Sequence, residues 1–231
     1  MLPGIKIRTA VILIAAGSAL IAASVSLFAY NRWDEERAND KAAETARLFI
    51  SAVRAADSQI GGAGPPTGNS AADPESGKDR PLGQTIVIDN YNYIGVLSIP
   101  SLGLSLPVMD SWSYPRLKLS PCRYFDTIGG NNLVIAAHNY NRHFGHIDKL
   151  AYADPVIITD TAGGVHNYRV AEVTAVDAGD MIGMIDSGYA LTLFTCTYGG
   201  QARVTVRCVK NEAEDRRESV SYIYVSIGNV L

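Results

Sequence analysis

The sequence predicts an all-β domain, a closed or nearly closed β-barrel with short helices, which follows an apolar amino-terminal segment and a helix. Three observations lead to this prediction. Residues 9–31 carry no charge, residues 33–56 repeat apolar side chains at helical spacing, and residues 85–231 consist of short apolar or alternating runs separated by turn residues. A chain of 231 residues is long enough for one domain of ordinary size and such an appendage.

The uncharged segment, residues 9–31, is rich in Ala, Ile, Leu and Val. It exceeds the roughly 20 residues that a helix needs to cross the hydrocarbon core of a membrane. Lys6 and Arg8 precede the segment, and acidic residues at 34–36 follow it. Because positive charges stay on the cytoplasmic side, we predict a cytoplasmic tail at residues 1–8, a single-pass transmembrane anchor at residues 9–31 and an extracellular remainder.

A cleaved signal peptide is the alternative for the same segment. The apolar region of a signal peptide is usually only about 7–15 residues long. Ala22-Ala23-Ser24 offers a passable cleavage site. The length of the uncharged run favours an uncleaved anchor in the cell membrane.

Residues 32–57 are predicted to form a juxtamembrane helix. Charges fill many of its positions, and the apolar residues recur at helical spacing, namely Ala42, Ala46, Phe49, Ile50 and Val53. This helix is either a simple stalk or packs beside the barrel. Residues 58–84 are rich in Gly, Pro, Ser and Ala, so we predict a flexible linker there.

The folded domain is predicted at residues 85–231. Its strand-like runs are separated by turn residues and are Gly95–Ile99, Leu104–Val108, Leu133–His138, Pro155–Thr159, Asn167–Val176, Leu191–Cys196, Ala202–Val209 and Ser221–Val225. Ile147–Leu150 is expected to form a short helical turn. Many short strands separated by turn residues are typical of a closed or nearly closed barrel.

Two of these runs form a hairpin. Leu191–Cys196 is dominated by apolar and β-branched side chains, and Ala202–Val209 alternates on the return. Gly199-Gly200 between them can supply the positive φ values that a tight reversal needs. We therefore expect Cys196 and Arg203 to lie close together at one edge of the sheet.

A histidine also ends a strand, because His138 follows the apolar run of residues 132–137. A cysteine, a histidine and an arginine at strand ends indicate thiol chemistry on an acyl group. Cys196 would form a thioester, His138 would act as general acid and general base, and Arg203 would stabilise an oxyanion. The plainer interpretations are a core cysteine, a strand-end histidine and a solvated arginine. Arg207 is a rival for the role of Arg203.

These residues resemble the active-site signature of the sortases, the cysteine transpeptidases of Gram-positive cell surfaces. The signature is Thr192-Leu193-Phe194-Thr195-Cys196 followed by Arg203, and His138-Asn139-Tyr140-Asn141-Arg142-His143-Phe144-Gly145 resembles the sortase histidine segment. Residues 94–100 and 104–108 resemble the first two strands of that family. The likeness spans roughly residues 93–225, in the family's order.

The resemblance implies an eight-stranded sortase β-barrel, and the number of strand-like runs agrees. It implies a transpeptidase that cuts a surface protein at a motif of the Leu-Pro-x-Thr-Gly kind and holds the threonyl carbonyl as a thioester on Cys196. The acceptor would be an amine of a peptidoglycan precursor or of a pilin lysine. The amino-terminal helix favours class B or a related class.

Further residues are expected around this site. The backbone N–H of Thr197 would be a second oxyanion donor, and Thr195 and Thr197 would contact the substrate. Met181 and Ile182 would form an apolar wall for the Leu or Pro of a sorting signal, although this segment could equally belong to the core.

Other chemistries receive little support. The net charge is −3 without a basic stripe, which argues against nucleic acid as a partner. His138, His143 and His146 have no cysteine or carboxylate cluster nearby, so we predict no metal and no cofactor. Calcium stays open at three acidic residues before the cysteine strand, which are Asp177, Asp180 and Asp186.

Three cysteines are an odd number for an exported protein, so at least one thiol is free or pairs between chains. Cys208 lies about five residues beyond the hairpin partner of Cys196, at about 3.3 Å per residue. That offset exceeds the ~7 Å limit on Cα separation in a disulfide, so the sequence argues against a bridge between Cys196 and Cys208 unless the hairpin slips. A bridge between Cys122 and Cys208 stays open.

Two alternatives to a transpeptidase remain at this point. One is a sortase-like hydrolase whose acyl acceptor is water. The other is an inactive, membrane-anchored β-barrel that binds a partner.

Overall fold

The computed structural model describes residues 7–60, 84–197 and 199–211. The chain divides into two compact units, Met1–Ala38 and Asn39–Leu231. Most of the predicted linker and the predicted strand Ser221–Val225 lie outside the described residues.

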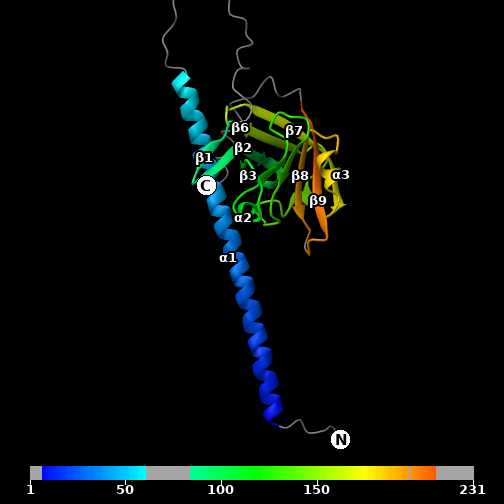
Figure 1. The fold of residues 1–231 in the computed structure, drawn as a ribbon. Coiled ribbons are helices and arrows are strands. Elements are labelled where there is room, and N and C mark those ends of the chain that lie inside the picture. The colour runs from blue at the N-terminus through cyan, green and yellow to red at the C-terminus, as the bar shows by residue number, and fades with distance from the viewer. Residues whose placement is uncertain (1–6, 61–83, 198, 212–231) are drawn as a thin grey trace, which may run out of the picture. The chain divides into compact units, whose positions relative to one another are not determined.

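Helix α1 (Ile7–Ile60) contains both of the helices that we predicted separately at residues 9–31 and 32–57 (Figure 1). They are continuous because no proline or glycine occurs between residues 18 and 60. The segment Thr9–Ala55 contains a stretch that could span a membrane by its length and composition. Within the first unit, its large apolar side chains are exposed. A signal sequence would meet the same criteria.

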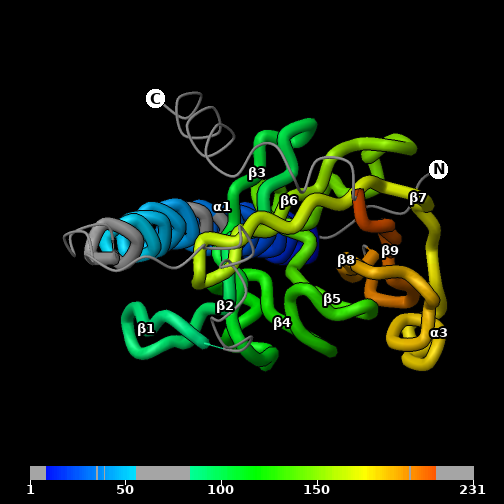
Figure 2. Tube along the Cα trace, turned by 90° about the horizontal axis from the view of Figure 1, so that it is seen from above, coloured from blue at the N-terminus to red at the C-terminus, as the bar shows by residue number. Residues whose placement is uncertain are grey.

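The second unit contains a closed eight-stranded barrel (Figures 1 and 2). Around the barrel, the strands are β2 (Tyr91–Ile99), β3 (Leu104–Met109), β4 (Cys122–Phe125), β5 (Leu133–Ala136), β8 (Leu191–Cys196), β9 (Ala202–Lys210), β7 (Val165–Asp177) and β6 (Pro155–Asp160). Pairing of β6 with β2 closes the barrel. A further strand, β1 (Ile86–Ile88), pairs with the start of β2. The short helices are η1 (Pro100–Leu102), α2 (Tyr114–Leu117), η2 (Ile147–Lys149) and α3 (Met181–Ile185).

This barrel confirms the predicted all-β fold with eight strands. One of the eight barrel strands in the described residues, β4, was not predicted. β4 pairs in parallel with β3 only at Met109 and Cys122, and it pairs antiparallel with β5. A four-residue strand that includes an arginine and a bulge gives no clear alternation in the sequence. The predicted helical turn at Ile147–Leu150 is confirmed as η2.

The main core fills the barrel and determines which face of β8 points outward. Leu191 and Leu193 belong to that core, whereas Phe194 packs in a separate cluster with Met184 of α3. Burial of each large apolar side chain stabilises the fold by about 2 kcal/mol. Because side chains alternate along a strand, Cys196 lies on the same outer face as Phe194.

The carboxyl-terminal part of α1 packs on the barrel, within the second unit. Ala42 joins the main core, and Phe49 and Val53 pack with Tyr93 and Met109 in a second cluster. Of the two alternatives for the juxtamembrane helix, packing beside the barrel is therefore the one that the structure shows.

Candidate active site

The β8–β9 hairpin places a cysteine directly opposite an arginine. Cys196 pairs with Arg203 in the antiparallel ladder, and Gly199 and Gly200 in the turn have φ values of 92° and 73°. Side chains that are directly opposite in such a ladder have Cβ atoms about 4.5–5.5 Å apart. The hairpin itself thus brings the thiol-bearing and guanidinium-bearing residues together.

Parallel pairing of β5 and β8 brings His138 to the same end of the barrel. The ladder pairs Ala136 with Phe194, and the N–H of Ala137 donates to the carbonyl of Phe194 at 3.2 Å. Continued by two residues, this register puts His138 level with Cys196. The three residues that we predicted to be catalytic therefore lie on three neighbouring strand ends, although their chemical roles stay a prediction.

A hydrogen bond joins the two segments beside the site. Thr195 is 3% exposed, and its hydroxyl donates to the carbonyl of Ala137 at 2.9 Å. This bond links the strand ends that carry Cys196 and His138. The contact with a substrate that we predicted for Thr195 stays a prediction.

The loop that follows β5, residues 138–145, is closed by main-chain hydrogen bonds. The N–H of Phe144 donates to the carbonyl of His138 at 3.1 Å, and the N–H groups of His143 and Gly145 both donate to Tyr140 at 2.9 Å. The His138 ring stacks on the Tyr140 ring, with centroids 4.9 Å apart and an interplanar angle of 24°.

The two candidate arginines have different surroundings. The guanidinium of Arg203 donates to the carbonyls of Gly200 and Ala202, at 3.2 and 3.3 Å, and so lies against the turn beside Cys196. Arg207 is paired with Thr192, further from the turn, and donates to the carbonyl of Gly183 in α3 at 3.3 Å. Its guanidinium also lies over the ring of Tyr189, 5.5 Å from the centroid. Arg203 is thus the arginine beside the thiol, and Arg207 holds the segment between β7 and β8.

The backbone N–H of Thr197 is engaged inside the hairpin. It donates to the carbonyl of Ala202 at 3.0 Å, and the Thr197 hydroxyl donates to the same carbonyl at 3.1 Å. In this conformation the N–H is engaged within the hairpin, and its role as a second oxyanion donor stays a prediction. Thr197 itself is only partly buried and lies directly after Cys196.

The segment between β7 and β8 presents apolar side chains near the site. Asp180 caps α3 by accepting a hydrogen bond from the N–H of Gly183 at 2.8 Å. Met181 is 38% exposed and Ile182 is 74% exposed, whereas Met184 is buried against Phe194. The two residues predicted as an apolar wall are therefore accessible, and the segment contributes to the core through Met184.

An aromatic row, which sequence reasoning missed, extends over the outer face from β8. Phe194 contacts Tyr124 edge to face at 5.3 Å, Tyr124 contacts Trp112 at 5.4 Å, and Trp112 contacts Tyr114 at 5.9 Å. Trp112 and Tyr114 are exposed. No periodic signal reveals this row, because its members come from β8, β4, the loop after β3 and the start of α2.

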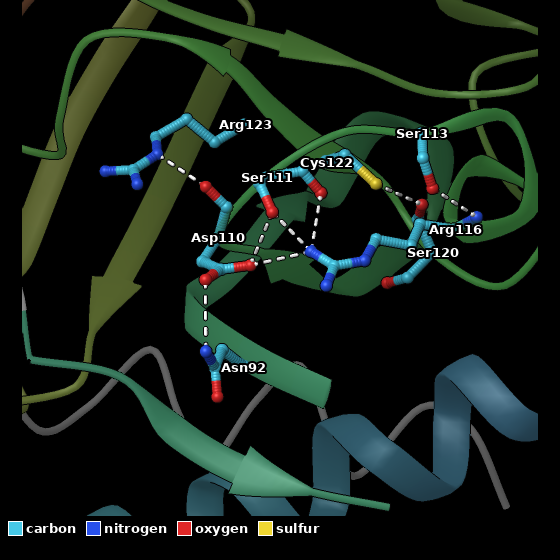
Figure 3. Close-up of polar contacts among 8 residues, drawn as sticks. All are labelled: Asn92, Asp110, Ser111, Ser113, Arg116, Ser120, Cys122 and Arg123. Carbon is cyan, nitrogen blue, oxygen red and sulfur yellow. Dashed lines mark hydrogen bonds and ion pairs between the residues drawn. The ribbon is translucent and has the colours of Figure 1, made fainter. Parts of the chain in front are cut away.

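The loop that carries Trp112 is held by the carboxylate of Asp110 (Figure 3). This carboxylate accepts hydrogen bonds from Asn92 at 3.2 Å, from Ser111 at 3.0 Å and from Arg116 at 3.0 Å. Burial acts to raise the pKa of Asp110, but the hydrogen bonds from Asn92 and Ser111 and the charge of Arg116 outweigh it and lower that pKa. Arg123 donates to the main-chain carbonyl of Asp110 at 2.7 Å. The loop is therefore fixed beside β4.

Cys196 differs from the other two cysteines in exposure. All three thiols are free, so the Cys122–Cys208 bridge does not form. Burial raises the pKa of Cys122 and of Cys208 to about 12, which keeps both as neutral thiols at ordinary pH. Only Cys196 is partly exposed. It is the cysteine that a substrate can reach.

Comparison with known proteins identifies the family of this barrel. Residues 97–211 match the model of the sortase domain family. A search of curated proteins finds no match.

Similar solved structures are sortases of several classes. A sortase D5 transpeptidase of Clostridium perfringens is 23% identical over 52% of this chain and 79% of that chain, with a TM-score of 0.46. Sortase A of Corynebacterium diphtheriae is 22% identical over 53% of this chain and 62% of that chain, with a TM-score of 0.48. Sortase C1 of Streptococcus agalactiae is 25% identical over 54% of this chain and 70% of that chain, with a TM-score of 0.47. The family match carries the assignment, and it assigns residues 97–211 to the sortase domain family.

Proposed function

We propose that this chain is a membrane-anchored sortase, a cysteine transpeptidase that cleaves an LPXTG-like sorting signal and transfers the product to an amine. The observation that supports the proposal most is the ladder register, in which Cys196 lies opposite Arg203 and, by continuation of the β5–β8 pairing, level with His138. The sortase family match over the barrel adds to it.

In the first half of the reaction, the sulfur of Cys196 attacks the threonyl carbonyl after its proton passes to His138. The carbon–nitrogen bond of the scissile peptide breaks, and His138 returns the proton to the departing amine. A thioester remains on Cys196. The charge that develops on the carbonyl oxygen is stabilised by the guanidinium of Arg203, which leaves its turn carbonyls to reach that oxygen.

In the second half, an amine attacks the thioester carbonyl. His138 takes the proton that this amine loses and returns it to the departing sulfur of Cys196, so the free thiol is restored and a new amide bond is formed. The amine would belong to a peptidoglycan precursor or to a pilin.

The apolar surface beside Cys196 suits the leucine and proline of a sorting signal. Met181 and Ile182 offer exposed apolar side chains on one side. The aromatic row from Phe194 to Trp112 continues the same outer face. We assign the Leu-Pro part of the signal to this surface.

The domain would act outside the cell. The charges that flank the apolar part of α1 favour an amino terminus in the cytoplasm, which supports this orientation. The packing of the second half of α1 on the barrel supports class B or a related class.

The test is mass spectrometry of the full chain in detergent, incubated with a panel of sorting-signal peptides and triglycine. We expect a thioester on Cys196 and a peptide–triglycine product. Cys196→Ala abolishes both, and Cys122→Ala, which removes a buried thiol elsewhere, retains both. Hydrolysed peptide without any triglycine product would instead support a hydrolase, and cleavage by Cys196→Ala would refute the assignment.

A further inference from the structure

The loop after β5 contains three rings in a row. The His138 ring stacks on Tyr140 at 4.9 Å, and the other neighbour of Tyr140 is His143, with centroids 5.5 Å apart and an interplanar angle of 46°. Tyr140 thus contacts both imidazoles. Of the three residues in this row, only His138 has a role in the proposed reaction.

The backbone of the loop is closely constrained around these rings. Two N–H groups converge on the carbonyl of Tyr140, and Phe144 closes the loop onto His138. A Cβ at Gly145 would lie 2.7 Å from the carbonyl oxygens of both Asn139 and Tyr140. The next apolar residue, Phe144, is fully buried in the main core. The loop is therefore closely packed around these rings.

His143 is buried in a way that hydrogen bonding does not explain. Its side chain is 0% exposed, and neither ring nitrogen has a hydrogen-bond partner among the described residues. Burial of an unpaired polar group costs about 1–3 kcal/mol, so such a group in a packed protein calls for a reason. Its contact with Tyr140 offers one, because the ring fills space behind the aromatic side chain.

The charge state of His143 is consistent with this role. Burial, and to a lesser extent the nearby His138, lower the pKa of His143 to about 4. The ring is therefore neutral at ordinary pH and places no positive charge beside His138. A charged neighbour would oppose protonation of the residue that carries the proton in the reaction.

We propose that Tyr140 and His143 are positioning residues for His138, in which the buried His143 ring supports the Tyr140 ring and Tyr140 fixes the plane of the His138 imidazole by stacking. The inference rests on the proposed function of His138. In this proposal His143 acts only through the shape of its buried ring and transfers no proton.

Two pairs of variants separate the ring from its polar atoms. His143→Phe keeps a buried ring and removes both nitrogens, whereas His143→Ala removes the ring. Tyr140→Phe keeps the stacking ring, whereas Tyr140→Leu removes it at a site that is only half-buried. Tyr140→Leu serves if His143→Ala fails to fold. His146→Ala is the matched control, because it removes an imidazole from the same region that is not in the row.

The first measurement is NMR of the full chain in detergent with labelled histidines. The sequence has only four histidines, so the spectrum is simple to assign with single variants. A stacked ring shields the protons above its face. We expect the ring protons of His138 to move downfield in His143→Ala and in Tyr140→Leu, and to stay near their wild-type positions in His143→Phe and His146→Ala.

The second measurement is the rate of peptide transfer by the same proteins. Misplacement of a reacting group by about 1 Å can cost 100-fold in rate. We expect His143→Ala and Tyr140→Leu to lower kcat roughly 10- to 100-fold with little change in KM, and His143→Phe to recover most of that loss.

Unchanged His138 resonances and unchanged kcat in His143→Ala or Tyr140→Leu would overturn the proposal, and so would a His143→Phe variant as impaired as His143→Ala. The resonance shifts do not depend on activity. If the chain proves not to be a transpeptidase, they still test the stack, so the failure of one proposal is distinguishable from the failure of the other.

Discussion

The hydroxyl of Thr195 donates to the carbonyl of Ala137 at 2.9 Å, which joins two segments 58 residues apart in the chain. Thr195 directly precedes Cys196, and Ala137 directly precedes His138. A single hydrogen bond thus joins the two residues that directly precede Cys196 and His138. We infer that this bond sets the distance between the proposed thiol and imidazole.

Thr195→Val should test this bond, because valine has nearly the same shape and lacks the hydroxyl. We expect a loss of about 1–3 kcal/mol of stability, since the buried carbonyl of Ala137 loses a donor. We also expect slower peptide transfer at unchanged KM. Denaturant unfolding and steady-state kinetics measure the two effects.

The matched control for this variant is Thr192→Val on the same strand. The Thr192 hydroxyl is also buried, but it lies 3.3 Å from the hydroxyl of Ser187 and away from His138. It should lower stability without the same loss of rate. Equal losses of rate in both variants would remove the special role that we give Thr195.

Thiol labelling should separate the three cysteines. Cys196 is partly exposed, whereas burial raises the pKa of Cys122 and Cys208 to about 12. An alkylating reagent should therefore modify Cys196 alone in the folded protein, and all three thiols after unfolding in denaturant. Peptide mapping by mass spectrometry identifies the sites, and early modification of Cys208 would contradict its burial.

The pH dependence of stability should contain a contribution from His143. Burial lowers its pKa from 6.5 to about 4, so between these values the unfolded chain binds a proton that the folded chain does not. Stability is therefore full above about pH 6.5 and falls as the pH approaches 4, by about 3 kcal/mol in total. Urea unfolding at a series of pH values measures this loss.

His143→Phe is the comparison that isolates this contribution, because phenylalanine does not titrate. The difference in stability between the two proteins should change between pH 6.5 and 4 and be constant above pH 7. The lowered pKa values of Asp110 and Asp160 act at lower pH, where those carboxylates become protonated. If the difference in stability stays constant across the whole range, folding does not change the protonation of His143, and this prediction is wrong.

The two arginines should give different kinetic defects. Arg203→Ala removes the guanidinium beside Cys196, and loss of one oxyanion donor lowers kcat by roughly 100-fold or more. Arg207→Lys keeps a charge but cannot both reach the carbonyl of Gly183 and lie flat on Tyr189. We expect this second variant to raise KM roughly 10-fold, as for a loss of about 1.4 kcal/mol, with a smaller change in kcat. The opposite pattern would exchange the roles that we assign to them.

The hairpin and the barrel could be predicted because their signals are local. Alternation on β8 and β9 and the glycines between them are enough to place Cys196 opposite Arg203, and the structure has that register. The missed strand β4 shows the limit of this approach. It is short and bulged, and its pairing partners are what make it a strand.

The surroundings of the site could not be predicted in the same way. The burial of Thr195 and its bond to Ala137 depend on parallel pairing between distant strands. The row of rings around Tyr140 depends on how one loop folds back on itself, and the aromatic row from Phe194 to Trp112 joins three separate segments. Such contacts are set by tertiary structure, which a pattern along one segment does not encode.

The parallel pairing of β5 with β8 also has a consequence for when the protein becomes reactive. β6 and β7 lie between these strands in the chain and form the other side of the barrel. The entropy of closing so long a loop must be overcome before the two strand ends meet. Until β5 and β8 pair, Cys196 and His138 lie apart in the chain, so the proposed activity would appear at the end of folding rather than at an early stage of it.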